Sequence, residues 1–239
     1  MANGKKNPFE TTSAPVGRKL SRAGRVSIAL KAAILNGDLE PGSKVNLEEM
    51  RGKFGVSLSP LREAMSRLTT TCLVEFEDQR GYRIAPLTRK NLEEVIRLRA
   101  ELECLAVSTA IDVADLDWES SVLAALHHLT SLEKSSNARC DDTEWADAHR
   151  AFHDAMISGC GMDLLIEYCS NLHNQIERYR RILQGNARCT DHVAEEHIAM
   201  ADAAVTRDRA LAVSLVRGHI ERVGAGLLAA MSEYPETAR

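Results

Sequence analysis

The stretch FGVSLSPLREAMSRL (residues 54–68) decides the fold of the first part of this chain. Gly55 is a natural stop for one short helix, and the apolar spacing after it predicts a second helix from about Leu58 to Thr70. Ser57 or Ser59 is a suitable N-cap for this second helix. The residues expected to face inward are Ala64, Met65 and Leu68.

The flanking segments extend this helix–turn–helix pattern. Residues 21–37 are predicted to form a helix with an inward stripe at Val26, Leu30, Ala33 and Ile34. Residues 46–55 form a short helix that Asn46 caps, with Glu49 completing a capping box. LVEFEDQRGYRIAPL (73–87) alternates with period two around a turn near residues 78–81, which predicts a β-hairpin. Helices followed by a hairpin predict a winged helix-turn-helix, whose second helix enters the major groove of DNA.

Polar and basic residues gather on the parts of this motif that would face DNA. Ser57 and Ser59 are able to donate to phosphates or base edges, and Arg62 lies one turn into the helix, where it could pair with a guanine. The alternative is that the serines only cap the helix and that Arg62 pairs with Glu63 or with solvent. The predicted DNA-binding residues are Ser57, Ser59, Arg62, Arg67, Arg80, Gly81 and Arg83.

The charge distribution indicates two domains. The chain has 239 residues and a formal net charge of −4. Residues 1–90 contain 16 Lys and Arg against nine Asp and Glu, whereas residues 91–239 contain 14 against 25. A basic front part suits a polyanionic partner. There is no apolar run long enough to span a membrane and no secretory signal, so we expect a cytoplasmic protein whose six cysteines are reduced thiols.

From residue 88 onward the sequence shows only helical periodicity. Helices are expected near 88–113, 117–135, 142–159, 161–184, 190–206 and 207–232. The fold class is therefore mainly α, with an antiparallel helical bundle behind the winged helix-turn-helix. The expected divisions are a mobile arm at 1–20, a DNA-binding domain at 21–87, a helical domain at 88–232 and a tail at 233–239.

All eight histidines lie in the helical part. His149 and His153 are four residues apart and share a helix face, while His197 and His219 stand on two later helices. Each one alone is more typical of an ordinary core or surface histidine. If the four converge, they form a nitrogen-rich site, which prefers Zn, Ni or a similar ion to Mg or Ca. The remaining histidines are predicted to be surface or core residues: His127, His128, His173 and His192.

The segment AILNGDLEPGSKVNLEEMRGKFGVSLSPLREAMSRLTTTCLVEFEDQRGYRIAPL (33–87) resembles the DNA-binding domain of the GntR family of bacterial regulators. The resemblance covers about residues 21–87 and includes Gly-Val-Ser-x-x-Pro-x-Arg-Glu-Ala and a wing with Arg-Gly. Two positions depart from the family pattern. Leu58 stands where the family usually has a basic residue, which removes one expected DNA contact, and Cys72 stands where it usually has Gly.

Residues 88–232 resemble the FCD effector domain of the FadR-type branch of this family. Phe152-His153, His197 and His219 match the family's metal-binding pattern, and His149 occupies the place of its Asp or Asn. The resemblance implies a metal site that includes His153, His197 and His219, and a small carboxylic-acid effector bound at or next to the metal. His149 is predicted to be the fourth metal ligand; the alternative is that it only contacts the effector. Arg99 matches an arginine that the family directs toward this pocket; the alternative is a helix-face pair with Glu103.

The resemblance also implies a homodimer that binds a near-palindromic operator in double-stranded DNA and acts as a repressor relieved by its effector. A metal-dependent enzyme of the helical-bundle type is one alternative, but Glu-x-x-His repeats, GxSxG and HExxH are absent. A mononuclear hydrolase would leave the helix-turn-helix without a role. A regulator that senses acyl-CoA is the other alternative, although such members of the branch lack the metal-binding histidines.

Overall fold

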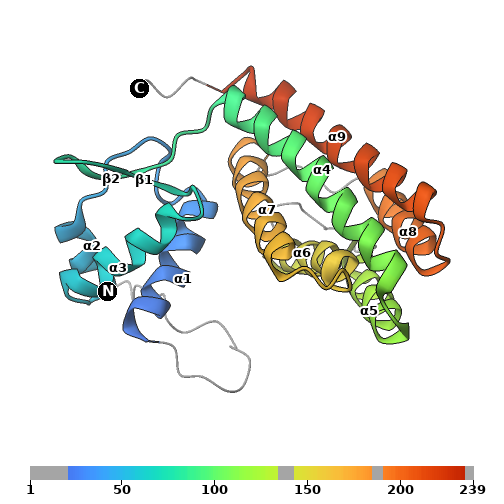
Figure 1. The fold of residues 1–239 in the computed structure, drawn as a ribbon. Helices are drawn as coiled ribbons and strands as arrows, with labels where there is room; N and C mark the ends of the chain where they lie inside the picture. Colours follow the sequence, from blue (N-terminus) through green and yellow to red (C-terminus); the bar gives the residue numbers. More distant parts are fainter. Residues whose placement is uncertain (1–20, 134–142, 185–190, 235–239) are drawn as a thin grey trace, which may run out of the picture. The chain divides into compact units, whose positions relative to one another are not determined.

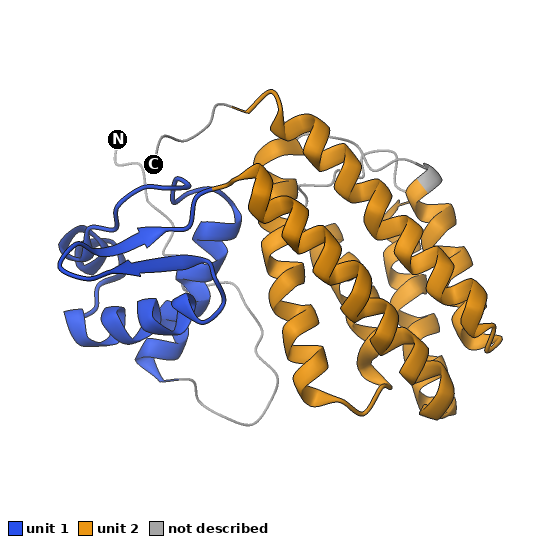
Figure 2. Cartoon of the chain, turned by 45° about the horizontal axis from the view of Figure 1, so that its top comes forward, with its two compact units in different colours: residues 1–86, 237–239 blue, residues 87–236 orange. Residues whose placement is uncertain are grey.

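The computed structural model describes residues 21–133, 143–184 and 191–234. The predicted arm at 1–20, Cys140, Cys189 and the end of the predicted tail lie outside these residues, as does the side chain of His192. The chain divides into two compact units, and the division falls between Pro86 and Leu87 (Figure 2). Each unit has its own apolar core.

The first unit begins with α1 (Arg22–Leu35), α2 (Leu47–Phe54) and α3 (Leu58–Thr69) and ends with an antiparallel hairpin of β1 (Val74–Glu77) and β2 (Gly81–Ile84), as Figure 1 shows. The predicted inward residues of α3 are all buried. On α1 the stripe is confirmed for Val26, Leu30 and Ile34, whereas Ala33 is only half-buried. This core holds α3 by its apolar face and leaves the opposite face exposed.

The caps of these helices differ from one another. The Oδ1 atom of Asn46 accepts hydrogen bonds from the backbone N–H groups of Glu48 and Glu49, and Gly55 ends α2 with a φ of 61°. Ser57 has the N-cap position of α3, but its side chain makes no capping hydrogen bond. Ser57 therefore takes the predicted N-cap position, but its hydroxyl does not cap the helix. Pro60 stands at the third position of α3 and has no N–H, so one of the two donors that an N-cap side chain normally uses is missing.

Cys72 has a φ of 57°, a left-handed conformation that L-residues seldom adopt. This geometry gives a physical reason for the glycine that related sequences usually have at this position, because glycine adopts a positive φ without a steric penalty. Within the described residues, Cys72, Cys104, Cys160 and Cys169 are free thiols.

The second unit consists of α4 (Arg89–Val113), α5 (Leu116–Glu133), α6 (Thr143–Ser158), α7 (Asp163–Gln184), α8 (Asp191–Val205) and α9 (Arg209–Met231). These bounds lie within a few residues of the predicted ones. Helix α4 packs along α9 and against α7, and α5 packs against α6 and α8 (Figure 1). A Cβ atom added at Gly224 would lie 2.7 Å from Ile96, so α4 and α9 approach too closely there for a side chain. None of the described helices combines the length and apolar character needed to cross a membrane.

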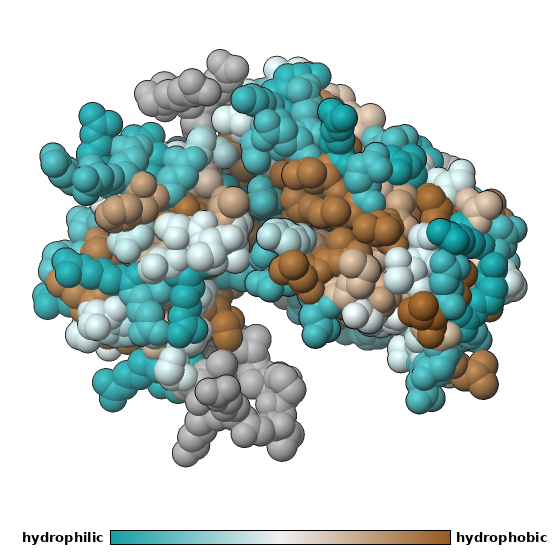
Figure 3. All heavy atoms as spheres, viewed as in Figure 1, coloured by the Kyte–Doolittle hydropathy of each residue, from teal (hydrophilic) through white to brown (hydrophobic). Residues whose placement is uncertain are grey.

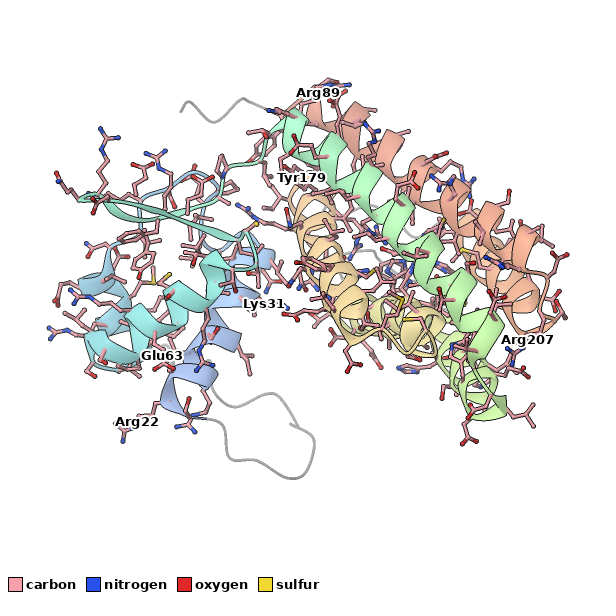
Figure 4. All side chains as sticks on the ribbon, viewed as in Figure 1. Arg22, Lys31, Glu63, Arg89, Tyr179 and Arg207 are labelled. Atoms are coloured by element: carbon pink, nitrogen blue, oxygen red, sulfur yellow. The ribbon has the colours of Figure 1, made fainter. Side chains whose placement is uncertain are left out.

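Two side chains tie α4 at its ends (Figure 4). The hydroxyl of Tyr179 on α7 lies 3.1 Å from the backbone nitrogen of Thr88, from which it accepts a hydrogen bond, and 2.9 Å from Oδ1 of Asn91. At the other end, Arg207 donates to the carbonyl oxygens of Ile111 (2.6 Å) and Ala114 (2.9 Å). Because the last carbonyls of a helix have no partner inside it, Arg207 completes the C-terminus of α4.

Large apolar side chains stay exposed on α4 and α7. Leu98 and Leu105 lie on α4, and Leu164 and Tyr168 lie on α7; each is about half exposed or more. Figure 3 shows apolar side chains gathered over the same region of the helical unit. We call these four residues the α4–α7 apolar face.

Candidate functional site

The first turn of α3 presents polar side chains to solvent. Ser59 and Arg62 are exposed there. They lie next to Ser57, whose hydroxyl makes no capping hydrogen bond. Glu63 pairs with Arg67 at 2.6 Å and not with Arg62, so only the solvent-exposed form of the alternative for Arg62 remains. No residue in the described ranges pairs with the Arg62 side chain. The turn thus combines unused donors with the N–H groups of a helix start, which favour an anion such as phosphate.

The hairpin places further basic residues beside α3. Gly81 has a φ of 85°, which the tight turn between β1 and β2 requires. Arg80, with a side chain 80% exposed, and Arg83 both lie near Glu77, at 3.4 Å and 3.6 Å. The hydroxyl of Tyr82 lies 3.5 Å from the carbonyl oxygen of Arg62 and so connects the hairpin with α3. Loose, exposed ion pairs of this kind contribute little stability, which leaves these arginines available to phosphates.

The four predicted histidines of the helical unit lie together. His149 and His153 come from α6, His197 from α8 and His219 from α9. Each offers one nitrogen, and these nitrogens all lie within 4.8 Å of one another. The ring centroids are 4.6 to 6.4 Å apart, and the side chain of His197 has no exposed surface. We call these four residues the histidine cluster.

Burial favours the neutral form of three histidines in this cluster. Desolvation, with smaller contributions from neighbouring histidines, lowers the pKa of His149 and of His153 well below the ordinary value of 6.5. Burial also lowers the pKa of His219, and this effect outweighs its hydrogen bond to Glu196. Burial alone would raise the pKa of Glu196, but hydrogen bonds from His219 and Arg222 bring it down to about 2. The imidazoles of His149, His153 and His219 therefore keep their lone pairs, while Glu196 stays anionic.

The donor set fits a borderline transition-metal ion. The buried Nδ1 of His149 and the buried Nε2 atoms of His153 and His197 have no hydrogen-bond partner among the described residues. A buried polar atom without a partner is costly, and several of them pointing to one place indicate a ligand. Neutral imidazole nitrogens are good ligands for Zn²⁺, Ni²⁺ and related ions and poor ones for Mg²⁺ or Ca²⁺.

Carboxylates lie on the outer side of three of the histidines. Glu196 lies 2.8 Å from Nδ1 of His219, Glu133 lies 3.3 Å from Nδ1 of His197, and Glu103 lies 3.8 Å from Nδ1 of His153. These glutamates come from three different helices, α8, α5 and α4. Residues in such positions orient metal-binding histidines in other proteins. Sequence reasoning did not find Glu133 and Glu196, because nothing local marks a carboxylate that meets its histidine only after the helices pack.

Arg99 forms the helix-face pair that stood as its alternative. Its Nε and Nη2 atoms donate to the two carboxylate oxygens of Glu103, at 2.6 Å and 3.2 Å, and both side chains are only 5% exposed. Within the described chain Nη1 has no partner. This pairing places Arg99 close to the histidine cluster, because the same Glu103 also lies next to His153.

His173 is a residue of this region that the sequence did not single out. Its ring centroid lies 5.9 Å from that of His149 and 5.8 Å from that of His153, and its side chain is buried. Cys169, four residues before it on α7, is also buried. This i, i+4 spacing was the signal in the sequence that could have placed His173 on the inward face of the helix. By contrast, His127 and His128 are exposed on α5, as expected for surface histidines.

Comparison with known proteins gives the same two-part organisation. Residues 22–84 match the family of bacterial regulatory proteins named gntR, and residues 94–222 match the FCD domain. The HTH-type transcriptional regulator BphR of Paraburkholderia xenovorans is 31% identical, over 91% of this chain and 90% of BphR. The transcriptional repressor GlaR of Escherichia coli is 32% identical, over 80% of this chain and 89% of GlaR.

A solved structure has the same fold. The E. coli protein McbR/YncC superposes with a TM-score of 0.73 over 87% of this chain and 98% of that protein, at 20% sequence identity. The winged helix-turn-helix therefore acts as a DNA-binding domain and the helical bundle as an effector domain, and the chain is a regulator rather than an enzyme. This chain belongs to the GntR family of bacterial transcriptional regulators, in the group that carries an FCD domain.

Proposed function

We propose that the protein is a cytoplasmic, metal-containing repressor that leaves its operator when a small carboxylic acid binds the helical unit. The convergence of four histidines from three helices, three of them buried and one half-buried, carries this proposal. His149, His153, His197 and His219 would hold the ion, which we expect to be Zn²⁺ or Ni²⁺. When bound, the ion supplies a Lewis-acidic centre to which a carboxylate oxygen binds. The name of the relative GlaR, a transcriptional repressor, supports the direction of control.

Arg99 provides a second contact for the acid under this proposal. Glu103 occupies Nε and Nη2 of its guanidinium, so only Nη1 is left for a carboxylate. A guanidinium already balanced by Glu103 makes a weaker anion site than a free one, because the charge of the pair is close to zero. The ion therefore contributes most of the attraction for the acid, and Arg99 mainly orients it.

A homodimer accounts for the α4–α7 apolar face. Leu98 and Leu105 stand seven residues apart on α4, which places them on one side of the helix, and Leu164 and Tyr168 are four apart on α7. Exposed apolar patches that span two helices are typical of protein–protein contacts, and a twofold contact buries the same face on both copies. Two copies of α3 then read half-sites about 34 Å apart, which requires a near-palindromic operator.

In the DNA-binding unit the residues divide by role. Arg62, and Ser57 and Ser59 before it, would contact bases or phosphates in the major groove. Arg67, Arg80 and Arg83 would contact the phosphate backbone, and Gly81 provides the turn that brings Arg80 to the wing tip. Leu58 stands between the two serines and is able to make only apolar contacts.

The test uses the full-length chain and a promoter-sized duplex. Binding is measured by fluorescence anisotropy with metal-loaded and metal-stripped protein, over a series of salt concentrations and with a panel of small carboxylic acids. We expect binding that weakens steeply with salt, and release by at least one acid from the metal-loaded protein only. Release by the same acid from both forms would contradict a role for the ion. Release by an acyl-CoA from the stripped form would favour the acyl-CoA-sensing alternative.

A further inference from the structure

Three of the four histidines in the cluster have a carboxylate on the nitrogen that faces away from the centre. His219 donates to Glu196 at 2.8 Å, and the Nδ1 atoms of His197 and His153 have Glu133 and Glu103 as their nearest anionic groups. The Nε2 atoms of His153 and His197 are buried and have no hydrogen-bond partner in the described chain; Nδ1 of His197 also makes no hydrogen bond there, so Glu133 acts on it by charge alone. A neutral imidazole carries one proton on one of its two nitrogens. A carboxylate next to Nδ1 attracts that proton and leaves the Nε2 lone pair for a ligand.

The fourth histidine is held differently. The ring of His149 stacks on Trp145, with centroids 4.6 Å apart and an angle of 18° between the planes. The guanidinium carbon of Arg180 lies over the ring of Trp145, 4.7 Å from the ring centroid. No carboxylate of the described residues lies at ion-pair distance from His149, and its Nδ1 is buried without a partner. His149 is therefore positioned by its aromatic neighbour and not by a negative charge.

The cluster itself contributes no negative charge to balance a divalent cation. Burying such an ion among neutral ligands is costly unless anions lie nearby. Arg99 pairs with Glu103, and Arg222 pairs with Glu196, so each of these carboxylates is partly neutralised within the chain. Glu133 differs, because no Lys or Arg of the described residues pairs with it.

The surroundings of Glu133 show where a nearby cation would be most stabilising. Its side chain is 4% exposed, and its Oε2 atom is buried without a hydrogen-bond partner. Its other oxygen accepts from Nε1 of Trp145 at 3.3 Å, and Trp145 is the residue that holds His149. Glu133 thus connects two histidines of the cluster, and no Lys or Arg in the described part of the chain lies at ion-pair distance from its carboxylate.

We propose that Glu103, Glu133 and Glu196 are positioning residues of the histidine cluster, which fix the Nδ1–H form of three histidines and supply the negative charge that a bound divalent cation requires. This inference rests on the proposed metal binding. Glu133 contributes the largest share of the charge, because the other two carboxylates are already paired with arginines. Glu196 orients its histidine most strongly, because it is the one of these three glutamates that forms a hydrogen bond with its histidine, His219.

The first experiment measures the affinity of the full-length protein for Zn²⁺ and Ni²⁺ by competition with a chelator. Glu133→Gln and Glu196→Gln should each weaken binding about 10- to 100-fold, the usual range for such outer residues, and Glu103→Gln should have a smaller effect. Glu195→Gln is the matched control, because Glu195 is exposed on the same helix as Glu196. Glu133→Asp keeps the charge and should recover part of the lost affinity. Gln variants that bind both ions as tightly as the unmodified chain would overturn the proposal.

The second experiment does not depend on metal. In the metal-free protein, ¹⁵N NMR of the imidazoles should show the Nδ1–H form for His153, His197 and His219. Circular dichroism checks that each variant is folded. Failure of the unmodified chain to bind either ion would remove the proposed metal function, whereas Nε2–H forms at these three histidines would overturn the positioning role by itself. The two experiments therefore separate the failure of the metal proposal from the failure of the carboxylate proposal.

Discussion

The first turn of α3 and the histidine cluster both present polar atoms that have no partner in the described chain, but they differ in exposure. Ser59 and Arg62 lie in water, which satisfies their donors at little cost. His153 and His197 are buried, and their Nε2 atoms lose water without gaining a hydrogen bond. The first arrangement is stable without a ligand, whereas the second is stabilised by one. A ligand at α3 would therefore bind a unit that is already stable, while a ligand at the cluster would add to the stability of the helical unit.

The largest effect that this comparison predicts is on metal content. His197→Ala removes the most deeply buried nitrogen donor, and the affinity for Zn²⁺ or Ni²⁺ should fall by more than the ~100-fold limit typical of outer residues. Elemental analysis of purified protein and chelator competition measure the loss. His128→Ala, on an exposed position of α5, is the control and should bind metal normally. Equal metal content in both variants would show that the cluster is not the metal site.

The next effect is on operator binding. Arg62→Ala should weaken binding to the operator by about 1–3 kcal/mol and reduce discrimination against a scrambled duplex. Arg67→Ala should have a smaller effect that is similar on both duplexes, because Glu63 already pairs with Arg67. Anisotropy titrations at one salt concentration compare the two variants. The same loss for Arg62→Ala on both duplexes would assign Arg62 to phosphate and leave base recognition to other residues.

The buried histidines predict that the stability of the helical unit depends on pH in a way that the stability of the DNA-binding unit does not. Their folded pKa values lie below the ordinary 6.5, so the unfolded chain binds more protons than the folded chain as the pH falls through this value. The free energy of unfolding of the metal-free protein should therefore decrease as the pH falls below about 6.5. Urea unfolding between pH 8 and pH 5 measures it. Bound metal excludes protons from the same nitrogens and should delay the loss to lower pH; identical curves with and without metal would contradict this explanation.

The smallest effect concerns two N-caps of the DNA-binding unit. Asn46→Ala removes an acceptor for two backbone N–H groups of α2 and should cost about 1 kcal/mol of stability. Ser57→Ala removes a hydroxyl that caps nothing and should leave stability within about 0.5 kcal/mol of the unmodified chain while weakening DNA binding. Denaturant unfolding and anisotropy together distinguish the two. A stability loss for Ser57→Ala as large as that for Asn46→Ala would return Ser57 to a capping role.

The sequence predicted the two regions to different depths for a physical reason. The helix–turn–helix depends on neighbours in the chain, so glycine stops, caps and apolar spacing sufficed for α2 and α3, and the β-hairpin followed from alternation. Ser57 has the predicted N-cap position, but its hydroxyl makes no capping bond, and Pro60 offers no N–H at the third position of α3. Cys72 was visible only as a departure from a pattern, until its positive φ explained the departure.

The helical unit depends on contacts between residues far apart in sequence. Periodicity placed its helices well, but only the resemblance to known domains suggested that His153, His197 and His219 would meet. The position of His173 and the carboxylates of Glu133 and Glu196 depend on how α5, α7 and α8 pack, which no local pattern encodes. Arg99 illustrates the limit of spacing rules. Spacing offered its pairing with Glu103 as an alternative to a place near the cluster, but the structure has both.

Helix α4 runs from the residues beside the histidine cluster to the first residues of the helical unit. It is continuous over 25 residues, so it is about 37 Å long. Glu103 lies 15 positions from Thr88, which corresponds to an arm of about 22 Å. A tilt of about 5° pivoting at Glu103 moves the Thr88 end by about 2 Å, and the backbone there leads within two residues to the boundary at Pro86. Because Tyr179 bonds that end to α7, such a tilt would also change the hydrogen bonds between the two helices.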